Sequence, residues 1–359
     1  MKLAMVAGIG MFVALAASAA QAGVVVDLSP PAGDRWNYPF AGNGAESTLP
    51  IFAAMGRAGF DDRDGEASIY WQTGASVPAG FLPGQYRVTS AAVFARAYVS
   101  GPSLQFAYDA TQDTVQTYYA TDDAEYIADT DAGRPIELFA AGFRNAGTLA
   151  AYTEVSPFTT GAPLVPPAEG ARDMYPIFFS AAGLPVDSSR NVRLRYEAEP
   201  LAVGTTSLSP GEMVVNNTDF TFSINLGLAG VRQYVQGGLA GGKLAFVVTA
   251  LMQAQDFGGG VYPRLYSKEA TTIAYPGAQP ARLRLDVTLC VADVAGLGGT
   301  AEPDGQLTAD DVIAYLNGFF SGDTQTADVA VLGGAVGKDG QLTADDIIVF
   351  LNSFFGGCQ

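Results

Sequence analysis

The sequence DGQLTADD occupies residues 304–311 and returns unchanged at residues 339–346. An upstream ADVA and a Leu-Gly-Gly sequence repeat with the same offset, so that one unit spans residues 292–311 and the other 327–346. An apolar segment follows each unit. A tandem repeat that is rich in aspartate and glycine and precedes a helix is typical of a paired calcium-loop module.

Each repeat offers oxygen ligands at the spacing that a helical calcium loop uses. The aspartate of Asp-Gly-Gln supplies a side-chain oxygen, the glycine allows the sharp turn, and the glutamine supplies its backbone carbonyl. The standard offset puts Thr300 and Ala335 at the opening position, where neither is a good ligand, so we expect aspartates further upstream to open enlarged loops. The predicted ligands of two calcium ions are Asp293, Asp304, Gln306 and Asp311 in the first loop and Asp328, Asp339, Gln341 and Asp346 in the second.

The residues after each loop predict a helix. Thr308 and Thr343 are suitable N-caps, and the acids that follow them favour the positive end of a helix dipole. Apolar residues then recur at helical spacing, and we expect the two helices to turn these stripes toward each other. The stripes are Val312, Ile313, Leu316, Phe319 and Phe320, and Ile347, Ile348, Leu351, Phe354 and Phe355. The alternative is a pair of helical hairpins that bind no metal, but residues 290–359 hold ten acids and one lysine, a net charge of −9 that a small core tolerates poorly without cations.

Residues 290–359 resemble a dockerin domain, in the variant that ends in Gly-Cys at the C-termini of planctomycete secreted proteins. The resemblance rests on the two DGQLTADD blocks and on Gly357-Cys358. It implies two bound calcium ions and docking to a cohesin or to another extracellular scaffold protein. Gly337 departs from the cellulosomal pattern, which has a side-chain ligand there. The resemblance also implies two similar partner-binding faces, formed by Ala309, Asp310 and Asn317 and by Ala344, Asp345 and Asn352; alternatively, the symmetry is a relic of duplication and the module is a stable C-terminal cap.

The N-terminal residues predict export. Lys2 precedes an apolar run over residues 3–17, and Ala20-Gln21-Ala22 is a small-residue cleavage site, so residues 1–22 are predicted to be a signal peptide. The run is short for a membrane anchor, which is the alternative. We therefore expect a protein that is secreted, extracellular or attached to the cell surface, with no transmembrane segment in the mature chain.

The chain has two cysteines, Cys290 and Cys358, and they flank the repeat. An oxidising compartment permits a disulfide between them, which would join the two ends of the repeat. Two free thiols are the alternative.

Composition limits the remaining possibilities. The net charge is −17 and the chain lacks histidine. Nucleic-acid binding is disfavoured because phosphates require a basic surface. Histidine-dependent catalytic triads and the usual zinc ligands are also excluded, whereas paired-carboxylate chemistry is still possible.

Residues 23–289 have the period of β-strands. Apolar and polar residues alternate over 220–226 and 283–289, and residues 93–99, 192–196 and 244–251 read as further strands. Because each has one apolar face and one polar or mixed face, the pattern predicts a β-sandwich of jelly-roll type. Residues 229–239 are predicted to be a short helix. No linker precedes Cys290, so the last strand should continue directly into a separate domain, residues 290–359.

The order of elements in residues 23–289 is similar to that of DNRLRE-type sandwich domains of bacterial and archaeal surface proteins. The residues that carry this resemblance are 222–225, 231–238, 242–246, 266–269 and 281–285, with 68–72 and 85–99 as early strands; residues 118–190 have no counterpart. The resemblance implies a binding or structural module, with a polysaccharide as a second class of partner. No catalytic residue is identified. A secreted polysaccharide-degrading enzyme, a glycoside hydrolase or lyase, is the alternative function.

Two smaller clusters in the same region have a structural and a functional interpretation. Residues 61–66 contain four carboxylates and are predicted to form a solvated turn, with a further calcium site as the alternative. Trp36, Tyr38, Tyr70 and Trp71 are predicted to be aromatic core, with a sugar-stacking platform as the alternative.

Overall fold

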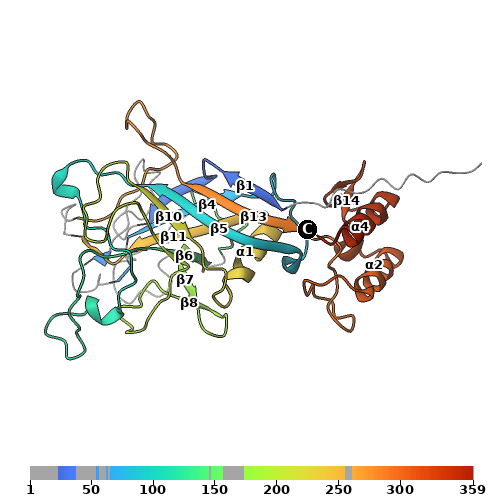
Figure 1. Ribbon diagram of the computed structural model, residues 1–359, viewed down its shortest axis with the longest axis horizontal. Coiled ribbons are helices and arrows are strands. Elements are labelled where there is room, and N and C mark those ends of the chain that lie inside the picture. Colours follow the sequence, from blue (N-terminus) through green and yellow to red (C-terminus); the bar gives the residue numbers. More distant parts are fainter. Residues whose placement is uncertain are drawn as a thin grey trace, which may run out of the picture.

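The computed structural model describes residues 23–37, 54–55, 62–63, 65–144, 147–156, 174–254 and 261–358. The predicted signal peptide lies outside the described residues. The chain is mainly β, as expected, with two larger antiparallel sheets and a group of helices at the C-terminal end (Figure 1).

The smaller of these two sheets contains the strongest alternation in the sequence. Its strand order is β1 (Val24–Leu28), β13 (Arg282–Leu289), β5 (Tyr86–Arg96) and β10 (Asp219–Ser223). Along β13 the residues Leu283, Leu285, Val287 and Leu289 are buried, and those between them are more exposed. The predicted strands at 220–226 and 283–289 are therefore confirmed, although β10 ends at Ser223.

The larger sheet has seven strands. In order these are β2 (Gly33–Asn37), β4 (Glu66–Gln72), β11 (Lys243–Ala250), β6 (Ile136–Phe143), β7 (Met174–Phe179) and β8 (Pro185–Asp187), with β9 (Ala202–Val203) also paired to β6. Two short ladders complete the strands: β3 (Ala54–Met55) with β12 (Gln253–Ala254), and β14 (Ala330–Val331) with β15 (Ala335–Val336).

The central strand β11 departs from the prediction of one polar face. All eight of its residues are buried. Leu244, Phe246 and Val248 belong to the main hydrophobic cluster, whereas Ala245 and Val247 pack into a second cluster on the other side. A strand that is covered on both sides needs no polar face.

Both larger sheets and all four α-helices contribute to the main hydrophobic cluster. Helix α1 (Val231–Ala240) buries Val231, Val235 and Leu239, which lie on one side of the helix, so the predicted helix at 229–239 is confirmed with bounds shifted by one or two residues. Trp71 and Tyr70 are 1% and 7% exposed, as expected for core aromatics. Tyr38 lies outside the described residues.

The predicted strand at residues 192–196 is wrong, because residues 189–195 form turns. The side chain of Asn191 accepts a hydrogen bond from Arg63 Nε at 2.9 Å, and Arg63 Nη1 pairs with Glu137 Oε2 at 2.5 Å. Arg63 is 2% exposed. The need to satisfy a buried guanidinium explains why this segment turns back rather than extending along a sheet.

The same contacts correct the prediction for residues 61–66. Asp62 and Arg63 are 1% and 2% exposed, so this part of the segment is not a solvated turn. Arg63 supplies a positive charge to Glu137, and the Asp62 carboxylate accepts a hydrogen bond from the amide of Arg193 at 3.1 Å. Asp61 and Asp64 lie outside the described residues.

Three helices lie C-terminal to β13: α2 (Ala309–Ser321), α3 (Thr324–Ala327) and α4 (Ala344–Gly356). Thr308 and Thr343 are the N-caps of α2 and α4, and the predicted helix starts are confirmed. Each threonine hydroxyl accepts a hydrogen bond at 3.2 Å from the amide two residues later, and a capping box completes each start. The same local sequence therefore begins both helices in the same way.

The packing between α2 and α4 differs from the predicted pair of facing apolar stripes. The rings of Tyr315 and Phe350 stack at 3.8 Å between centroids and are each 1% exposed. Ile313, Leu316 and Phe320 point away from this contact and are 57%, 38% and 81% exposed. Both helices are apolar over most of their circumference, so the sequence does not determine which side is buried.

The C-terminal helices contact the end of the β-rich part. The amide of Cys290 donates to the carbonyl of Gln85 at 2.8 Å, and the Gln85 side chain donates to the carbonyl of Val291 at 3.0 Å. Gln325 reaches the carbonyl of Gly80 at 3.3 Å. Residues of both parts also belong to one hydrophobic cluster. Strand β13 thus continues directly into the C-terminal residues with no spacer, as Figure 1 shows.

The predicted disulfide between Cys290 and Cys358 is present, with Cα atoms 5.0 Å apart and a sequence separation of 68 residues. Replacement of both cysteines by alanine is expected to lower the free energy of unfolding of the C-terminal residues by roughly 4 kcal/mol, because the cross-link removes loop entropy from the unfolded chain. Chemical denaturation of oxidised and reduced wild-type protein, with the double variant in parallel, measures this difference. Equal stability of the three samples would contradict it.

Candidate metal centre and docking surface

The first repeat folds around two buried aspartates. Asp293 accepts hydrogen bonds from the amides of Asp304 at 3.1 Å and Gly305 at 2.9 Å. Asp311 accepts from the amides of Val294 at 2.9 Å, Ala295 at 3.0 Å and Thr308 at 2.8 Å. These bonds join the first residues of the repeat, the Asp-Gly-Gln turn and the start of α2 into one loop.

The second repeat reproduces this loop, with every residue number raised by 35. Asp328 accepts from the amides of Asp339 and Gly340, and Asp346 accepts from those of Val329, Ala330 and Thr343. The hydrogen-bond lengths of the two loops agree closely. Even the bond from the Asp304 amide to Asp293, at 3.1 Å, differs by only 0.2 Å from the equivalent bond from the Asp339 amide to Asp328, at 3.3 Å. Since the two copies have different surroundings, the loop conformation is encoded locally by the repeated sequence.

The remaining predicted ligands lie at the outer side of each loop. Asp304 and Asp339 are exposed, and each accepts a hydrogen bond at 2.9 Å from the amide of the glutamine two residues later. Gln306 and Gln341 are exposed as well. Each loop therefore places two buried carboxylates and one exposed carboxylate beside the same turn.

Few positively charged groups lie near the buried aspartates. Burial, with the nearby Asp311 carboxylate as the next cause, raises the pKa of Asp293 to about 6. Arg87 Nη2 lies 3.5 Å from Asp293 Oδ2, whereas Asp311, Asp328 and Asp346 form no ion pair within the described ranges. A buried carboxylate that has only amide partners is costly, and a bound cation would offset the charge.

The structure also sets a limit on this fit. In the part of the chain that the structure describes, the groups of three carboxylates with oxygens within 4.8 Å of one another lie in the β-rich part, and none lies in the repeats. Backbone amides are the hydrogen-bond donors to the buried carboxylates of each loop. The donor set of hard oxygens still suits calcium, with Asp293, Asp304 and Asp311 as the residues that would hold one ion and Asp328, Asp339 and Asp346 the other.

The Leu-Gly-Gly insertion forms a tight loop in both repeats. Gly298 and Gly299 have φ angles of +80° and +76°, which residues with a side chain rarely adopt. Asp310 Oδ2 accepts a hydrogen bond at 2.9 Å from the amide of Gly298, and Asp345 repeats this bond with Gly333. Asp310 and Asp345, which were predicted to face a partner, thus also fasten the insertion to the start of a helix.

An exposed apolar face lies on each of the two long helices. On α2 the predicted partner-binding residues Ala309 and Asn317 are exposed, and Ile313, Leu316 and Phe320 lie on the same side of the helix, at offsets of 4, 7 and 11 from Ala309. The sequence prediction placed these three apolar residues in the core. We call this set face 1: Ala309, Ile313, Leu316, Asn317 and Phe320.

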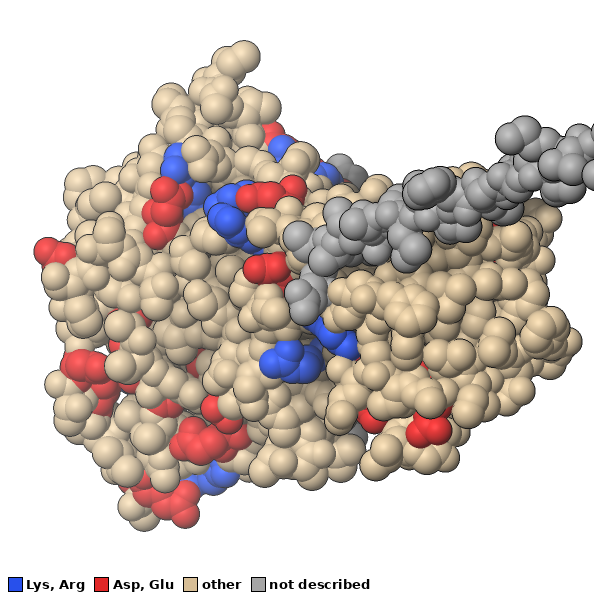
Figure 2. All heavy atoms as spheres, turned by 45° about the vertical axis from the view of Figure 1, so that its right-hand side comes forward, with Lys and Arg blue, Asp and Glu red and all other residues tan. Residues whose placement is uncertain are grey.

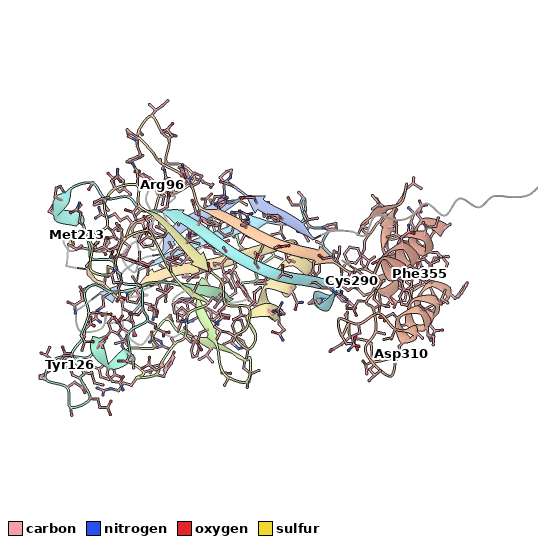
Figure 3. All side chains as sticks on the ribbon, in the orientation of Figure 1. Arg96, Tyr126, Met213, Cys290, Asp310 and Phe355 are labelled. Atoms are coloured by element: carbon pink, nitrogen blue, oxygen red, sulfur yellow. A yellow bond between two sulfur atoms is a disulfide. The ribbon has the colours of Figure 1, made fainter. Side chains whose placement is uncertain are left out.

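Helix α4 presents the equivalent set, which we call face 2: Ala344, Ile348, Leu351, Asn352 and Phe355. Exposure of the apolar side chains matches residue by residue, with 57% and 55% for the isoleucines, 38% for both leucines and 81% and 80% for the phenylalanines. Leu297 and Leu332 at the insertion tips are also alike, at 81% and 85%. Figure 2 shows a broad surface without Lys, Arg, Asp or Glu toward this end of the molecule, and Figure 3 labels Asp310 and Phe355 among the C-terminal helices.

Different cations lie near the two loops, Arg87 beside Asp293 in the first and Lys338 in the neighbourhood of Asp328 and Asp346 in the second. Besides its contact with Asp293, Arg87 donates hydrogen bonds to the carbonyls of Gly305 at 2.8 Å and Cys358 at 3.4 Å. A positive charge beside a carboxylate opposes the binding of a divalent cation by that carboxylate.

We expect Arg87→Gln to raise the calcium affinity of the first loop about tenfold, a change of about 1.4 kcal/mol, and to leave the affinity of the second loop unchanged. Calorimetric titration measures both sites, with Arg284→Gln as the control; an equal shift at both loops would contradict the prediction.

A separate cluster in the β-rich part surrounds Asp34. Its carboxylate accepts a hydrogen bond from the amide of Lys268 at 2.9 Å, and its amide donates to Glu154 at 3.1 Å. The ammonium group of Lys268 pairs with both Glu154 and Glu269. Burial, followed by the charge of Glu269, raises the pKa of Asp34 to about 7. The lysine already occupies the cationic position in this cluster.

This raised pKa predicts a pH-dependent stability. Since the folded state binds the Asp34 proton more tightly than the unfolded state, whose value is near 3.8, the contribution to stability is complete below pH 3.8 and is lost as the pH rises through about 7. We therefore expect Asp34→Asn to flatten the decline of unfolding free energy between these values. Denaturant titrations at several pH values test this, with the exposed Glu199→Gln as the control; parallel curves for wild type and Asp34→Asn would contradict it.

Comparison with known proteins adds no assignment. No family model matches the chain, and no curated protein matches it. Among the described residues, no helix has the length and hydropathy needed to cross a membrane.

Proposed function

We propose that this protein is a secreted, non-catalytic extracellular module that attaches to a partner through its C-terminal repeat. In this proposal residues 290–359 are a dockerin-like domain with two calcium ions, and the partner is a cohesin-like or another extracellular scaffold protein. Residues 23–289 are a jelly-roll β-sandwich that the docking domain holds at that scaffold.

The observation that carries the proposal is the pair of equivalent exposed faces. Soluble proteins rarely leave several large apolar side chains exposed together without a binding role. Here Ile313, Leu316 and Phe320 are exposed, and their counterparts on α4 have nearly the same exposure. Phenylalanine anchors at the centre of an apolar patch are typical of protein interfaces.

The loops give calcium a role in this docking. Asp311 lies in the first turn of α2 and binds amides from the start of the repeat, so that its carboxylate connects the loop to the helix that carries face 1. Asp346 does the same for α4 and face 2. An ion held by these carboxylates would fix the position of both faces, which explains why docking should depend on calcium.

A hollow on the smaller sheet is the proposed site for a polysaccharide. It has a volume of about 290 Å³, and its lining includes Phe94, Arg96, Asp219, Gln279 and Arg282. Arg96 donates hydrogen bonds of 2.6 and 2.8 Å to the Asp219 carboxylate. The Arg282 guanidinium covers the Phe94 ring at 4.1 Å from its centroid. Since Arg282 covers the ring, the hollow offers mainly polar groups, and fixed polar groups suit the hydroxyl groups of sugars.

Two experiments test the proposal. Immobilised full-length protein is incubated with the secreted and cell-envelope fraction, once with calcium and once with chelator. We expect a partner to be retained only with calcium. Absence of calcium-dependent retention would overturn the docking proposal.

A polysaccharide array is read for both retention of the protein and release of reducing ends. Retention that Gln279→Ala weakens supports the binding site, whereas release of reducing ends would identify an enzyme instead.

A further inference from the structure

A second group of carboxylates lies far from the C-terminal repeat, in the long connection between β5 and β6. Residues 97–135 contain no regular element longer than the two 3-10 turns η2 (Pro102–Leu104) and η3 (Val115–Tyr118). In Figure 3, Tyr126 of this connection lies at the end of the molecule opposite Asp310. A connection of this length in a compact fold needs some other means of fixing its conformation.

Three aspartates from the two ends of this connection meet in one place. Asp109, Asp113 and Asp131 each bring a carboxylate oxygen within 4.8 Å of the other two. The side chain of Asp109 is buried, at 3% exposure, and its Oδ2 has no hydrogen-bond partner. A buried carboxylate oxygen that lacks a donor calls for a further partner, and a cation is a partner that also offsets the charge.

The protein's own groups leave this requirement unmet. Thr111 Oγ1 lies 3.1 Å from Asp109 Oδ1 and 3.2 Å from Asp131 Oδ2, but a hydroxyl has one proton and can satisfy one of them at a time. Arg134 pairs with Asp113 at 2.7 Å and with Asp129 at 2.8 Å, so it offsets charge at Asp113, but among the described residues it forms no ion pair with Asp109 or Asp131. Four carboxylates with one guanidinium leave a net charge of −3.

We propose that Asp109, Asp113 and Asp131 bind a third divalent cation, of the calcium class, with the hydroxyl of Thr111 as a neighbouring oxygen. Carboxylates and hydroxyls are the hard ligands that calcium prefers. The ion fastens the start of the connection to its end. Residues 108–112 also contact the segment 197–212. Gln112 donates a hydrogen bond to the carbonyl of Ala198 at 3.0 Å, and the amide of Tyr108 donates one to the carbonyl of Glu212 at 2.8 Å. The site thus orders the end of the molecule opposite the docking faces.

Tyr118 provides a local probe of this site, because its hydroxyl donates a hydrogen bond to Asp113 at 2.9 Å. Terbium, which replaces calcium, emits when a nearby tyrosine is excited. In full-length protein with Asp311→Asn and Asp346→Asn, we expect tyrosine-sensitised terbium emission that Tyr118→Phe removes and that added calcium chloride reverses. Emission that is unchanged by Tyr118→Phe would overturn the assignment.

Calcium counting and hydrogen exchange complete the test. In that same background, Asp109→Asn with Asp131→Asn should lower the bound calcium by one ion per chain, whereas the exposed Asp122→Asn should leave it unchanged. In wild-type protein, calcium should slow amide exchange in residues 109–134. The proposal fails if the double substitution leaves stoichiometry unchanged, if Asp122→Asn lowers it equally, or if calcium leaves exchange in this segment unaltered. Because the C-terminal loops are disabled in the counting experiment, failure here is distinct from failure of docking.

Discussion

Chelation of calcium is expected to loosen the C-terminal helices while the two larger sheets keep their structure. The buried carboxylates of Asp293, Asp311, Asp328 and Asp346 outnumber the nearby cations, which are Arg87 at the first loop and Lys338 at the second, so we expect the repeat to need an added cation to offset their charge. A ligand at a thousand times its Kd stabilises the folded state by about 4 kcal/mol. We expect a loss of that order for the helices.

Hydrogen exchange resolved along the chain measures this effect. Amides of α2 and α4 should lose protection in chelator, and those of β11 and β13 should keep it. Asp311→Asn with Asp346→Asn is the matched control, because this variant should show the same exchange with and without chelator. Identical protection of wild-type α2 and α4 in both conditions would show that the helices do not depend on calcium.

Loss of both apolar faces is expected to abolish docking, whereas loss of either one should have little effect. Because the faces match residue by residue, Ile313→Asp with Phe320→Asp leaves face 2 intact and should leave partner capture nearly unchanged. Two anchors at about 2 kcal/mol each correspond to about a thousandfold in affinity. The variant that also carries Ile348→Asp and Phe355→Asp should therefore retain no detectable partner.

The matched control for this series is Ile273→Asp, since Ile273 is 95% exposed in the β-rich part. Retention from the secreted and cell-envelope fraction, together with a thermal melt of each variant, separates lost contact from lost folding. Loss of binding when only face 1 is changed would show that the two faces are not equivalent. Full binding by the four-site variant would show that docking uses another surface.

The sequence predicts best those features that depend on local contacts. The two loops and their helix starts follow from the repeated residues, because each hydrogen bond of Asp311 and Asp346 joins residues within one repeat. The alternation in β13 likewise encodes one buried face. These features can be predicted without knowing which residues distant in the sequence they contact.

Features that depend on distant contacts could not be predicted in this way. Val192, Leu194 and Tyr196 alternate like a strand, yet the buried Arg63 binds Asn191 and the segment turns. The α2 sequence is apolar on several sides, and the stacking of Tyr315 on Phe350 decides which side is buried.

The three-aspartate cluster follows the same rule. Asp109 and Asp131 belong to a segment with no periodic pattern, and only the folded connection brings them together. The unpaired Asp109 Oδ2, on which the proposal of a cation site rests, is visible only in the structure.

The number of calcium ions held by the repeat tests the central claim most directly. Equilibrium calcium binding is measured on full-length wild-type protein and on Asp311→Asn with Asp346→Asn. The two samples should differ by two ions per chain, because each substitution removes the buried closing carboxylate of one loop. Equal calcium binding by the two proteins would contradict the account and would favour a pair of acid-capped helical hairpins that bind no metal.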